Sequence, residues 1–536
     1  MAQDAQADRR QETLRPIRFP LPGATLSSMD RRCFIALPLA LAACSRKPRF
    51  AVEEVGITAL GEALRKGTVT VRGLVESYLW RIEEIDANGP KLNAVIEVNP
   101  DVLTIADSLD AELKAKGPRG PLHGIPILLK DNLDTADRMK TTAGSLALLD
   151  APTPKEDAPI VARLREAGAV VLGKTNLSEW ANIRANRSSS GWSGRGGLTR
   201  NPYALDRNTS GSSAGSGAAA AASLCAAAIG TETDGSIVSP SSVCGLVGIK
   251  PTVGLLSGEG IVPISHSQDT AGPMARSVRD AVLVLNAINR QGIDYTPNLD
   301  AAGLKGKRLG VARRYMGRNM HVTKLAENCL KALEAAGATL VDPFDMDDLD
   351  FSGERNTLLY ELKADMAAYL AQRGATMQSL DDLIAFNIEN ADRELPWFGQ
   401  EYFENAAKVE GLESPEYLEA REKVHKVKAD FAALLDASEV DAIVAATNNP
   451  AWLTDLVNGD NFGQGCSGPA AITGFPHITV PGGFVSGLPV GFSFFGRPND
   501  EANLIRMAYG FEQATKARRA PRYFEKTTPT PQVGRT

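Results

Sequence analysis

The stretch from Asn208 to Thr252 reads NTSGSSAGSGAAAAASLCAAAIGTETDGSIVSPSSVCGLVGIKPT and is nearly free of charge. It is dense in glycine, serine and alanine, and both Ser212 and Ser236 lie beside a glycine. Glycine allows a backbone to approach a ligand closely, and amides outside regular pairing can then point at an anion. Between the two Gly/Ser patches, the small residues of Ala218–Gly230 predict a buried helix. This alternation is typical of a tightly packed active-site core rather than of a linker.

The overall composition is that of a globular protein. The 536 residues are 43% hydrophobic and 23% charged, with a formal net charge of −6. A typical domain has about 100–200 residues, so the chain forms one large α/β domain with insertions or two domains. No long basic stripe is present, which argues against a nucleic-acid partner. The cysteines and histidines form no CxxC or HExxH motif, so we expect no metal site. The oligomeric state stays open.

The N-terminal region contains an export signal. Residues 29–44 read MDRRCFIALPLALAAC, in which two arginines precede a short apolar run. This run is too short for a bilayer span of about 20 residues. Its Leu-Ala-Ala-Cys ending resembles the bacterial lipobox, which implies that Cys44 is lipidated. The protein would then be an exported periplasmic lipoprotein that contacts the membrane only through this anchor. Arg31-Arg32 also resembles a twin-arginine signal. The alternative is a disordered tail followed by a buried apolar segment.

Helical and strand patterns alternate along the rest of the chain, which predicts an α/β fold with a mixed central sheet covered by helices on both faces. The segment Leu358–Leu435 is rich in helix formers and predicts a helical insertion. We expect this insertion and the Trp180–Trp192 region to form the walls of a substrate pocket. The predicted division of the chain is 1–28 as an extension upstream of the native start, 29–44 as the signal, 45–56 as a tether, 57–519 as a single domain with the insertion at 358–435, and 520–536 as a tail.

The expected elements have the following limits. Helices are predicted at 57–64, 71–85, 106–116 and 158–167, and strands at 94–98, 125–129, 169–172, 308–311, 339–341, 442–445, 477–480 and 489–495.

Three side chains are candidates for chemistry. Lys130 ends the apolar strand, where desolvation lowers the pKa of a lysine and makes the neutral amine available as a base. Ser213 is the centre of a GxSxG pattern, Gly211-Ser-Ser-Ala-Gly215. Ser236 follows a glycine turn whose preceding amides are free to form an oxyanion hole. Each also has a simpler interpretation when taken alone: a solvated strand end with Asp131 in a surface pair for Lys130, and a turn or helix cap for Ser236.

The contexts of Lys130, Ser212 and Ser236 together resemble the amidase signature family. The resemblance covers roughly Ile57 to Arg519 and rests on several segments in the family's order. These are GPLHGIPILLKDN (120–132), GKTNLSEWA (173–181), RNPY (200–203), the Gly/Ser core, GIKPTVG (248–254), SQDTAGPMARS (267–277), GFPHITVPGG (474–483) and GLPVGFSFFG (487–496).

This resemblance implies a Ser-cisSer-Lys triad. Ser236 would be the nucleophile that forms an acyl-enzyme, and Ser212, on a cis peptide, would bridge it to Lys130. The backbone amides of Thr233, Asp234, Gly235 and Ser236 would form the oxyanion hole. Ser213 would order the loop. The family needs no cofactor, and the implied substrate is a small-molecule or peptide amide.

Some positions depart from the usual family pattern. Ala214 stands in the usual GGSSGG segment, Asp234 replaces a glycine, and Val238 replaces an arginine that often follows Ser-Ile. The last change makes carboxylate recognition through that position doubtful. The segments GTETDGSIV, SEWANIRANRSSSGWSGRGG and GIVPISHSQDTAGPMARS are most similar to the bacterial peptide amidase subgroup, whose members remove the C-terminal amide from peptide amides and release ammonia.

Four alternatives stay open. An α/β-hydrolase esterase would use Ser213 with His477, but the segment before Ser213 is polar where that fold has a strand. A transamidosome component would pass ammonia to a tRNA-bound substrate, but it would act in the cytosol. A non-catalytic lipoprotein would retain only the fold. An amidase of the same family would act on another amide, for example an aryl, fatty-acid or cyclic one.

Overall fold

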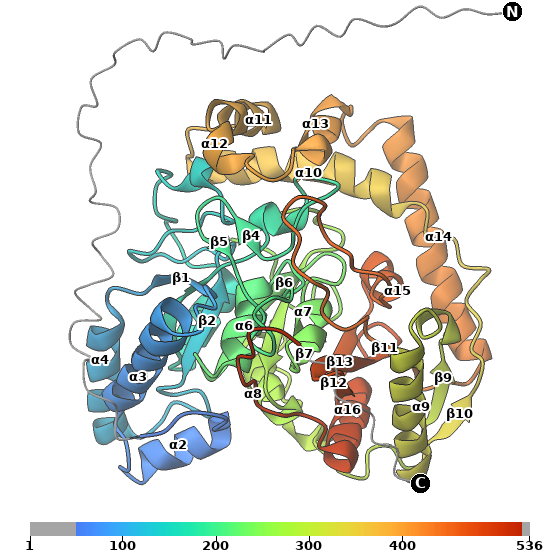
Figure 1. The fold of residues 1–536 in the computed structure, drawn as a ribbon, viewed down its shortest axis with the longest axis horizontal. Helices are drawn as coiled ribbons and strands as arrows, with labels where there is room; N and C mark the ends of the chain where they lie inside the picture. The colour runs from blue at the N-terminus through green and yellow to red at the C-terminus, as the bar shows by residue number, and fades with distance from the viewer. Residues whose placement is uncertain (1–49, 528–536) are drawn as a thin grey trace, which may run out of the picture.

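A mixed sheet of eleven strands forms the centre of the computed structural model, which describes residues 50–527 (Figure 1). Most neighbouring strands are antiparallel, but β2 pairs in parallel with β3 and β6, and β9 with β10 and β11. In spatial order the strands are β1 (Val95–Val98), β3 (Val170–Thr175), β2 (Pro126–Lys130), β6 (Ala227–Glu232), β8 (Thr270–Ala275), β7 (Val247–Lys250), β12 (His477–Val485), β13 (Leu488–Phe495), β11 (Ala442–Ala446), β9 (Arg308–Val311) and β10 (Thr339–Val341). A short hairpin of β4 (Trp192–Ser193) and β5 (Gly197–Leu198) lies outside this sheet.

Helices cover both faces of the sheet, which confirms the predicted fold class. On one face α6 (Ala214–Ala221) and α7 (Val238–Val243) pack together over the central strands. On the other face α8 (Val278–Ile288) and α16 (Glu501–Thr515) contact each other and the same strands. The remaining covering helices are α2 (Ile57–Arg65), α3 (Val71–Arg81), α4 (Val102–Lys116), α5 (Pro159–Glu166) and α9 (Met320–Ala335). Burial of apolar side chains from both faces forms one continuous core.

The chain between β10 and β11 is helical, as the sequence predicts. It forms α10 (Glu354–Arg373), α11 (Leu380–Glu389), α12 (Ala391–Glu394), α13 (Glu401–Lys408) and α14 (Pro415–Ala437), seen at the top and right of Figure 1. These helices have a separate apolar core, which they share with the loops around Ala147 and Trp180. The rings of Trp180 and Phe403 lie 5.7 Å apart between their centroids. The insertion is therefore packed directly onto the segment that was expected to form a pocket wall.

One prediction in the decisive stretch is wrong in part. Residues 218–230 do not form a single buried helix, because α6 ends at Ala221 and β6 begins at Ala227. All these residues are buried, so alanine satisfies a helix against a sheet and a central strand equally well. A short apolar run without periodicity does not distinguish the two.

The predicted signal at 29–44 and the lipidation site Cys44 lie outside the described residues. Within the part of the chain that is described, no helix combines the length and the apolar character needed to cross a bilayer.

Candidate functional site

Lys130 ends a central strand and is completely buried. The strand β2 lies between β3 and β6, so its last side chain is covered by neighbours on both sides. The Nζ atom donates to Ser212 Oγ at 2.7 Å, to Thr231 Oγ1 at 2.8 Å and to the Thr231 carbonyl at 3.3 Å. The interpretation of Lys130 as a solvated strand end is therefore wrong.

The pKa of Lys130 is lowered from its ordinary value to about 7. Burial is the main cause, since it disfavours the charged ammonium, and the negative charges of Asp269 and Glu232 oppose it only in part. Near neutral pH a large fraction of this lysine is a neutral amine. Such an amine accepts a proton from a hydroxyl that is hydrogen-bonded to it.

Ser212 and Ser213 lie at the start of α6, directly above the sheet. The peptide bond between Gly211 and Ser212 is cis, and the Ser212 side chain is buried against Lys130. The Ser213 hydroxyl donates to the Thr231 carbonyl at 3.1 Å and accepts from the Thr231 amide at 3.2 Å. Ser213 is thereby bound to β6, and its backbone amide donates to the Ser236 carbonyl at 3.2 Å. These contacts hold the two serine-bearing loops together.

Ser236 lies in the loop between β6 and α7. The loop turns at Gly235, whose φ of 77° lies in the left-handed region that glycine adopts without strain. Beyond the turn, one oxygen of Glu232 accepts from the amides of Ile237 at 2.7 Å and Val238 at 2.9 Å. Ser236 is therefore held between two fixed points, and it is 8% exposed.

The four consecutive amides of residues 233–236 have no acceptor among the residues that the structure describes. Such a series of unpaired amides forms a concave donor site for an anion. The Ser236 hydroxyl also makes no hydrogen bond within the described chain, so the structure joins Lys130 to Ser212 but does not join Ser212 to Ser236. In free enzymes such catalytic hydrogen bonds often close only when substrate is bound.

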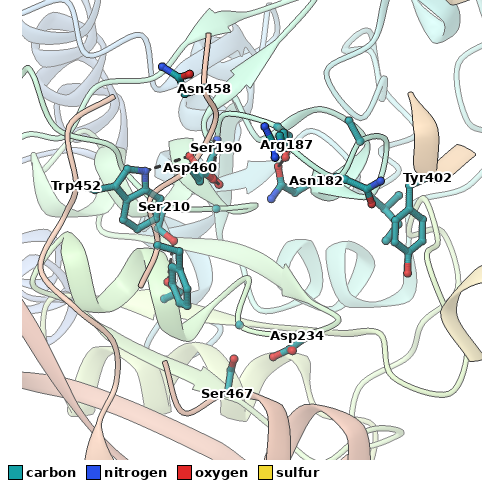
Figure 2. A pocket seen from close by; sticks show the side chains of 18 residues that line it. Asn182, Arg187, Ser190, Ser210, Asp234, Tyr402, Trp452, Asn458, Asp460 and Ser467 are labelled. Atoms are coloured by element: carbon teal, nitrogen blue, oxygen red, sulfur yellow. Dashed lines mark hydrogen bonds between the residues drawn. The ribbon is translucent and has the colours of Figure 1, made fainter. Parts of the chain in front are cut away.

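A cavity of about 550 Å³ opens beside these loops (Figure 2). Gly211 and Gly235, the residues directly before Ser212 and Ser236, line it. Its volume lies in the range of about 300–1,000 Å³ that is usual for small-ligand sites. Other parts of the wall come from residues 182–190, from Trp452–Phe462 and from Tyr402 on α13. The expected contributions of the Trp180–Trp192 region and of the helical insertion are both present.

The structure does not bring together the residues that an esterase site would need. His477 lies on β12, completely buried, and its Nε2 atom is 2.7 Å from Ser493 Oγ, whereas Ser213 contacts Thr231. Burial lowers the pKa of His477 to about 3. The segment 205–210 before Ser213 contains no strand. The surface pair expected of Asp131 is also wrong, since Asp131 is buried and lies 3.3 Å from Arg195.

Thr231 was not identified from the sequence. It accepts a hydrogen bond from Lys130 and one from the Asn132 amide at 3.0 Å, and its backbone holds Ser213. Its position at the end of β6, beside the end of β2, becomes visible only once the strand order is known.

One group of side chains has the geometry of a cation site, although it lies outside the cavity. Ligand atoms of His266, Glu361 and Asp365 lie within 4.8 Å of one another. The oxygens of Glu361 already accept from hydroxyls of Ser265, Ser267 and Tyr417, and Arg421 lies 3.7 Å away. A cation would have to displace these contacts, so the donor set fits an internal polar network better than a metal centre.

Comparison with known proteins places this geometry among amidases. A family model described as Amidase matches residues 73–505. The solved structure of the native peptide amidase from Stenotrophomonas maltophilia is 47% identical, covers 88% of this chain and 99% of that one, and superposes with a TM-score of 0.83. A probable amidase from Arabidopsis thaliana is 39% identical over 88% of this chain and 92% of its own length. One chain of the glutamyl-tRNA(Gln) amidotransferase from Coxiella burnetii is 33% identical over 86% of this chain and 97% of its own.

Proposed function

The chain belongs to the amidase family and is a carboxamide hydrolase, and from this premise we propose that it removes the C-terminal amide of peptides and releases the free acid and ammonia. The observation that carries the chemistry is the buried Lys130 amine, whose pKa is about 7, in contact with the Ser212 hydroxyl beside the cavity. The likeness to a peptide amidase supports the peptide substrate.

In the proposed reaction Ser236 Oγ attacks the carboxamide carbon. Its proton passes to Ser212 Oγ, and the Ser212 proton passes to the neutral Lys130 Nζ, so that Ser212 gives up one proton and receives another. When the tetrahedral intermediate collapses, the relay runs in reverse, and the nitrogen leaves as ammonia. Water then attacks the acyl-enzyme by the same relay and releases the acid.

The unpaired amides of residues 233–236 would receive the negative charge that develops on the carbonyl oxygen. Removing one such donor typically costs about 2.7–4 kcal/mol of transition-state stabilisation. Because these donors belong to the backbone, their positions depend on the loop rather than on side-chain identity. Ser213 and Thr231 have a positioning role, since they fix the two loops to β6.

The cavity supports a substrate larger than a simple amide. Its volume of about 550 Å³ exceeds what a carboxamide group needs, and the amide side chains of Asn182, Asn186 and Asn458 line its wall. Such side chains both donate and accept, as an extended peptide backbone requires. The peptide would place its terminal carboxamide at Ser236 and its remaining residues along this wall.

The test is ammonia release by the purified chain. The panel contains peptide amides, the matching free-acid peptides, an aryl amide, a fatty-acid amide and free glutamine, with Ser236→Ala as the control. We expect release from peptide amides, with all internal peptide bonds intact by mass spectrometry. Release only from the other amides would overturn the peptide substrate and leave the hydrolase chemistry in place. Release only from glutamine would favour an ammonia-donating component of an amidotransferase, the enzyme named for the Coxiella relative.

We also propose that the protein is an exported lipoprotein anchored at Cys44, on the basis of the signal at 29–44. Radiolabelled palmitate should enter the full-length chain in a bacterial host and should not enter the Cys44→Ala variant. Equal labelling of both chains, or labelling of neither, would overturn the anchor. Neither outcome bears on the hydrolase activity.

A further inference from the structure

Asp234 presents an unneutralised carboxylate to the substrate cavity. It lies two residues before Ser236, lines the cavity, and its side chain is exposed to that space (Figure 2). In the close view it faces Ser467 from the same end of the cavity as Gly235. No lysine, arginine or histidine of the described chain forms an ion pair with it. A carboxylate in this position imposes its charge on whatever group reacts at Ser236.

The other charged groups of the cavity wall do not duplicate this role. Asp460 is engaged by the Ser190 amide at 3.0 Å, by the Ser190 hydroxyl at 2.5 Å and by Trp452 Nε1 at 3.1 Å, so its oxygens are already occupied. Arg187 is exposed and lies across the cavity from Asp234 in Figure 2. The local charge at the reacting end is therefore set by Asp234.

The surroundings of Asp234 act on its charge in both directions. The titratable groups that face it are Glu232 on β6, Lys250 on β7, Tyr315, Glu354 on α10 and Cys466. Enclosure by protein raises its pKa, whereas the Ser467 hydroxyl and the Lys250 ammonium favour the ionised form.

Glu354 and Lys250 then settle how the charges near Asp234 are divided. The pKa of Glu354 is raised to about 8, by burial and by the charge of Asp234, so Glu354 holds a proton at neutral pH. The pKa of Lys250 is lowered to about 8, so this lysine stays mostly charged. Of the two acids, Asp234 is the one that carries the negative charge.

We infer that Asp234 is a specificity-determining residue that excludes carboxylates from the reaction centre. The inference rests on the proposed function. Hydrolysis of a neutral carboxamide produces an acid at the same carbon atom, and at neutral pH this acid loses a proton and becomes a carboxylate. The carboxamide approaches Asp234 without electrostatic cost, but the product carboxylate is repelled by it. The enzyme thereby prefers peptide amides to free-acid peptides and escapes inhibition by its own product.

The size of the effect follows from the repulsion of two like charges a few ångströms apart in a partly solvated cavity, which corresponds to about a 10- to 100-fold loss of affinity. The effect is specific for charge rather than for shape. It should therefore disappear when Asp234 is replaced by its neutral isostere, and it should persist when the charge is retained.

The test compares two inhibitors built on one peptide, the free acid and the corresponding C-terminal alcohol, which is neutral and resists hydrolysis. The ratio of the two inhibition constants, acid over alcohol, is measured for the wild-type protein, Asp234→Asn, Asp234→Glu and Asp300→Asn. Asp300 is an exposed carboxylate in a distant turn and controls for the loss of one charge. Because the measurement is a ratio within each variant, differences in turnover cancel.

We expect the ratio to fall about 10- to 100-fold in Asp234→Asn and to stay near the wild-type value in Asp234→Glu and Asp300→Asn. An unchanged ratio in Asp234→Asn would overturn the inference, as would a wild-type protein that binds acid and alcohol equally. If Asp234→Asn turns over too slowly for inhibition assays, calorimetry on Ser236→Ala with and without Asp234→Asn gives the same ratio. If peptide amides are not substrates, the pair of inhibitors is built on the amide that is hydrolysed, so the two proposals fail separately.

Discussion

Replacing Lys130 by methionine should abolish hydrolysis and at the same time change how stability depends on pH. The folded protein holds Lys130 with a pKa of about 7, whereas an unfolded chain has an ordinary lysine pKa near 10.4. The unfolded state therefore binds more protons between these values, and the stability of the wild-type protein rises with pH across this range. Methionine has a similar length and does not titrate.

The magnitude follows from the two pKa values. At pH 7.5 the transfer of a proton out of Lys130 on folding costs about 4 kcal/mol, and at pH 9.5 about 1.5 kcal/mol. Methionine removes this cost but leaves the hydroxyls of Ser212 and Thr231 without their donor, at about 1–3 kcal/mol each. The two contributions nearly cancel at pH 7.5, so the variant should be about as stable as the wild type there. At pH 9.5 the wild type should be the more stable, by about 2.5 kcal/mol relative to the comparison at pH 7.5.

Urea unfolding of both proteins at pH 7.5, 8.5 and 9.5 measures this difference in slope. All other titrating groups are shared, so their contributions cancel in the comparison. A difference in stability that does not change with pH would refute a lowered pKa for Lys130, and with it the neutral amine on which the mechanism depends.

Three further outcomes concern the same site, and a fourth concerns the wall beside it. The kcat/KM for a neutral amide should rise with pH and level off above about 7, with about one tenth of the plateau at pH 6; a profile that is flat from pH 5 to 8 would contradict Lys130 as the base. Thr231→Val removes an acceptor of the Lys130 ammonium and should shift this profile toward lower pH by about one unit, while Thr231→Ser should not. His477→Asn should keep kcat within a few-fold of the wild type in the steady-state assay, and its complete loss would revive a histidine-dependent mechanism. Glu394→Gln should weaken unfolding stability in urea, because Glu394 accepts from the Leu146 amide at 2.7 Å and lies 3.8 Å from the buried Arg184.

The outer parts of the fold were accessible from the sequence because their patterns are strong. The predicted strands at 308–311 and 339–341 agree with β9 and β10, and the strand at 442–445 ends one residue before β11. These segments combine apolar runs with turn residues at both ends. The helical insertion was recognised from its helix formers and its charged residues.

The centre of the sheet was harder to predict. The strands β6, β7 and β8 consist largely of glycine, alanine and other small residues that carry no period of two. Their conformation is decided by packing between neighbours, which a single sequence does not display. For the same reason the partnership of Thr231 with Lys130 was missed, since it depends on β6 lying next to β2.

The candidate site was predictable where local chemistry is enough. A lysine at the end of an apolar strand predicts a lowered pKa, and the structure agrees. The cavity wall was located only by region, and the open position of Asp234 toward it depends on the turn at Gly235.

The most direct test of the central claim is to identify the serine that reacts. The purified chain is treated with a fluorophosphonate, digested and mapped by mass spectrometry, together with Lys130→Ala, Ser213→Ala and Ser236→Ala. The account predicts a single adduct on Ser236, retained in Ser213→Ala and lost or greatly slowed in Lys130→Ala. An adduct on Ser213, or full amidase activity in Ser236→Ala, would contradict it.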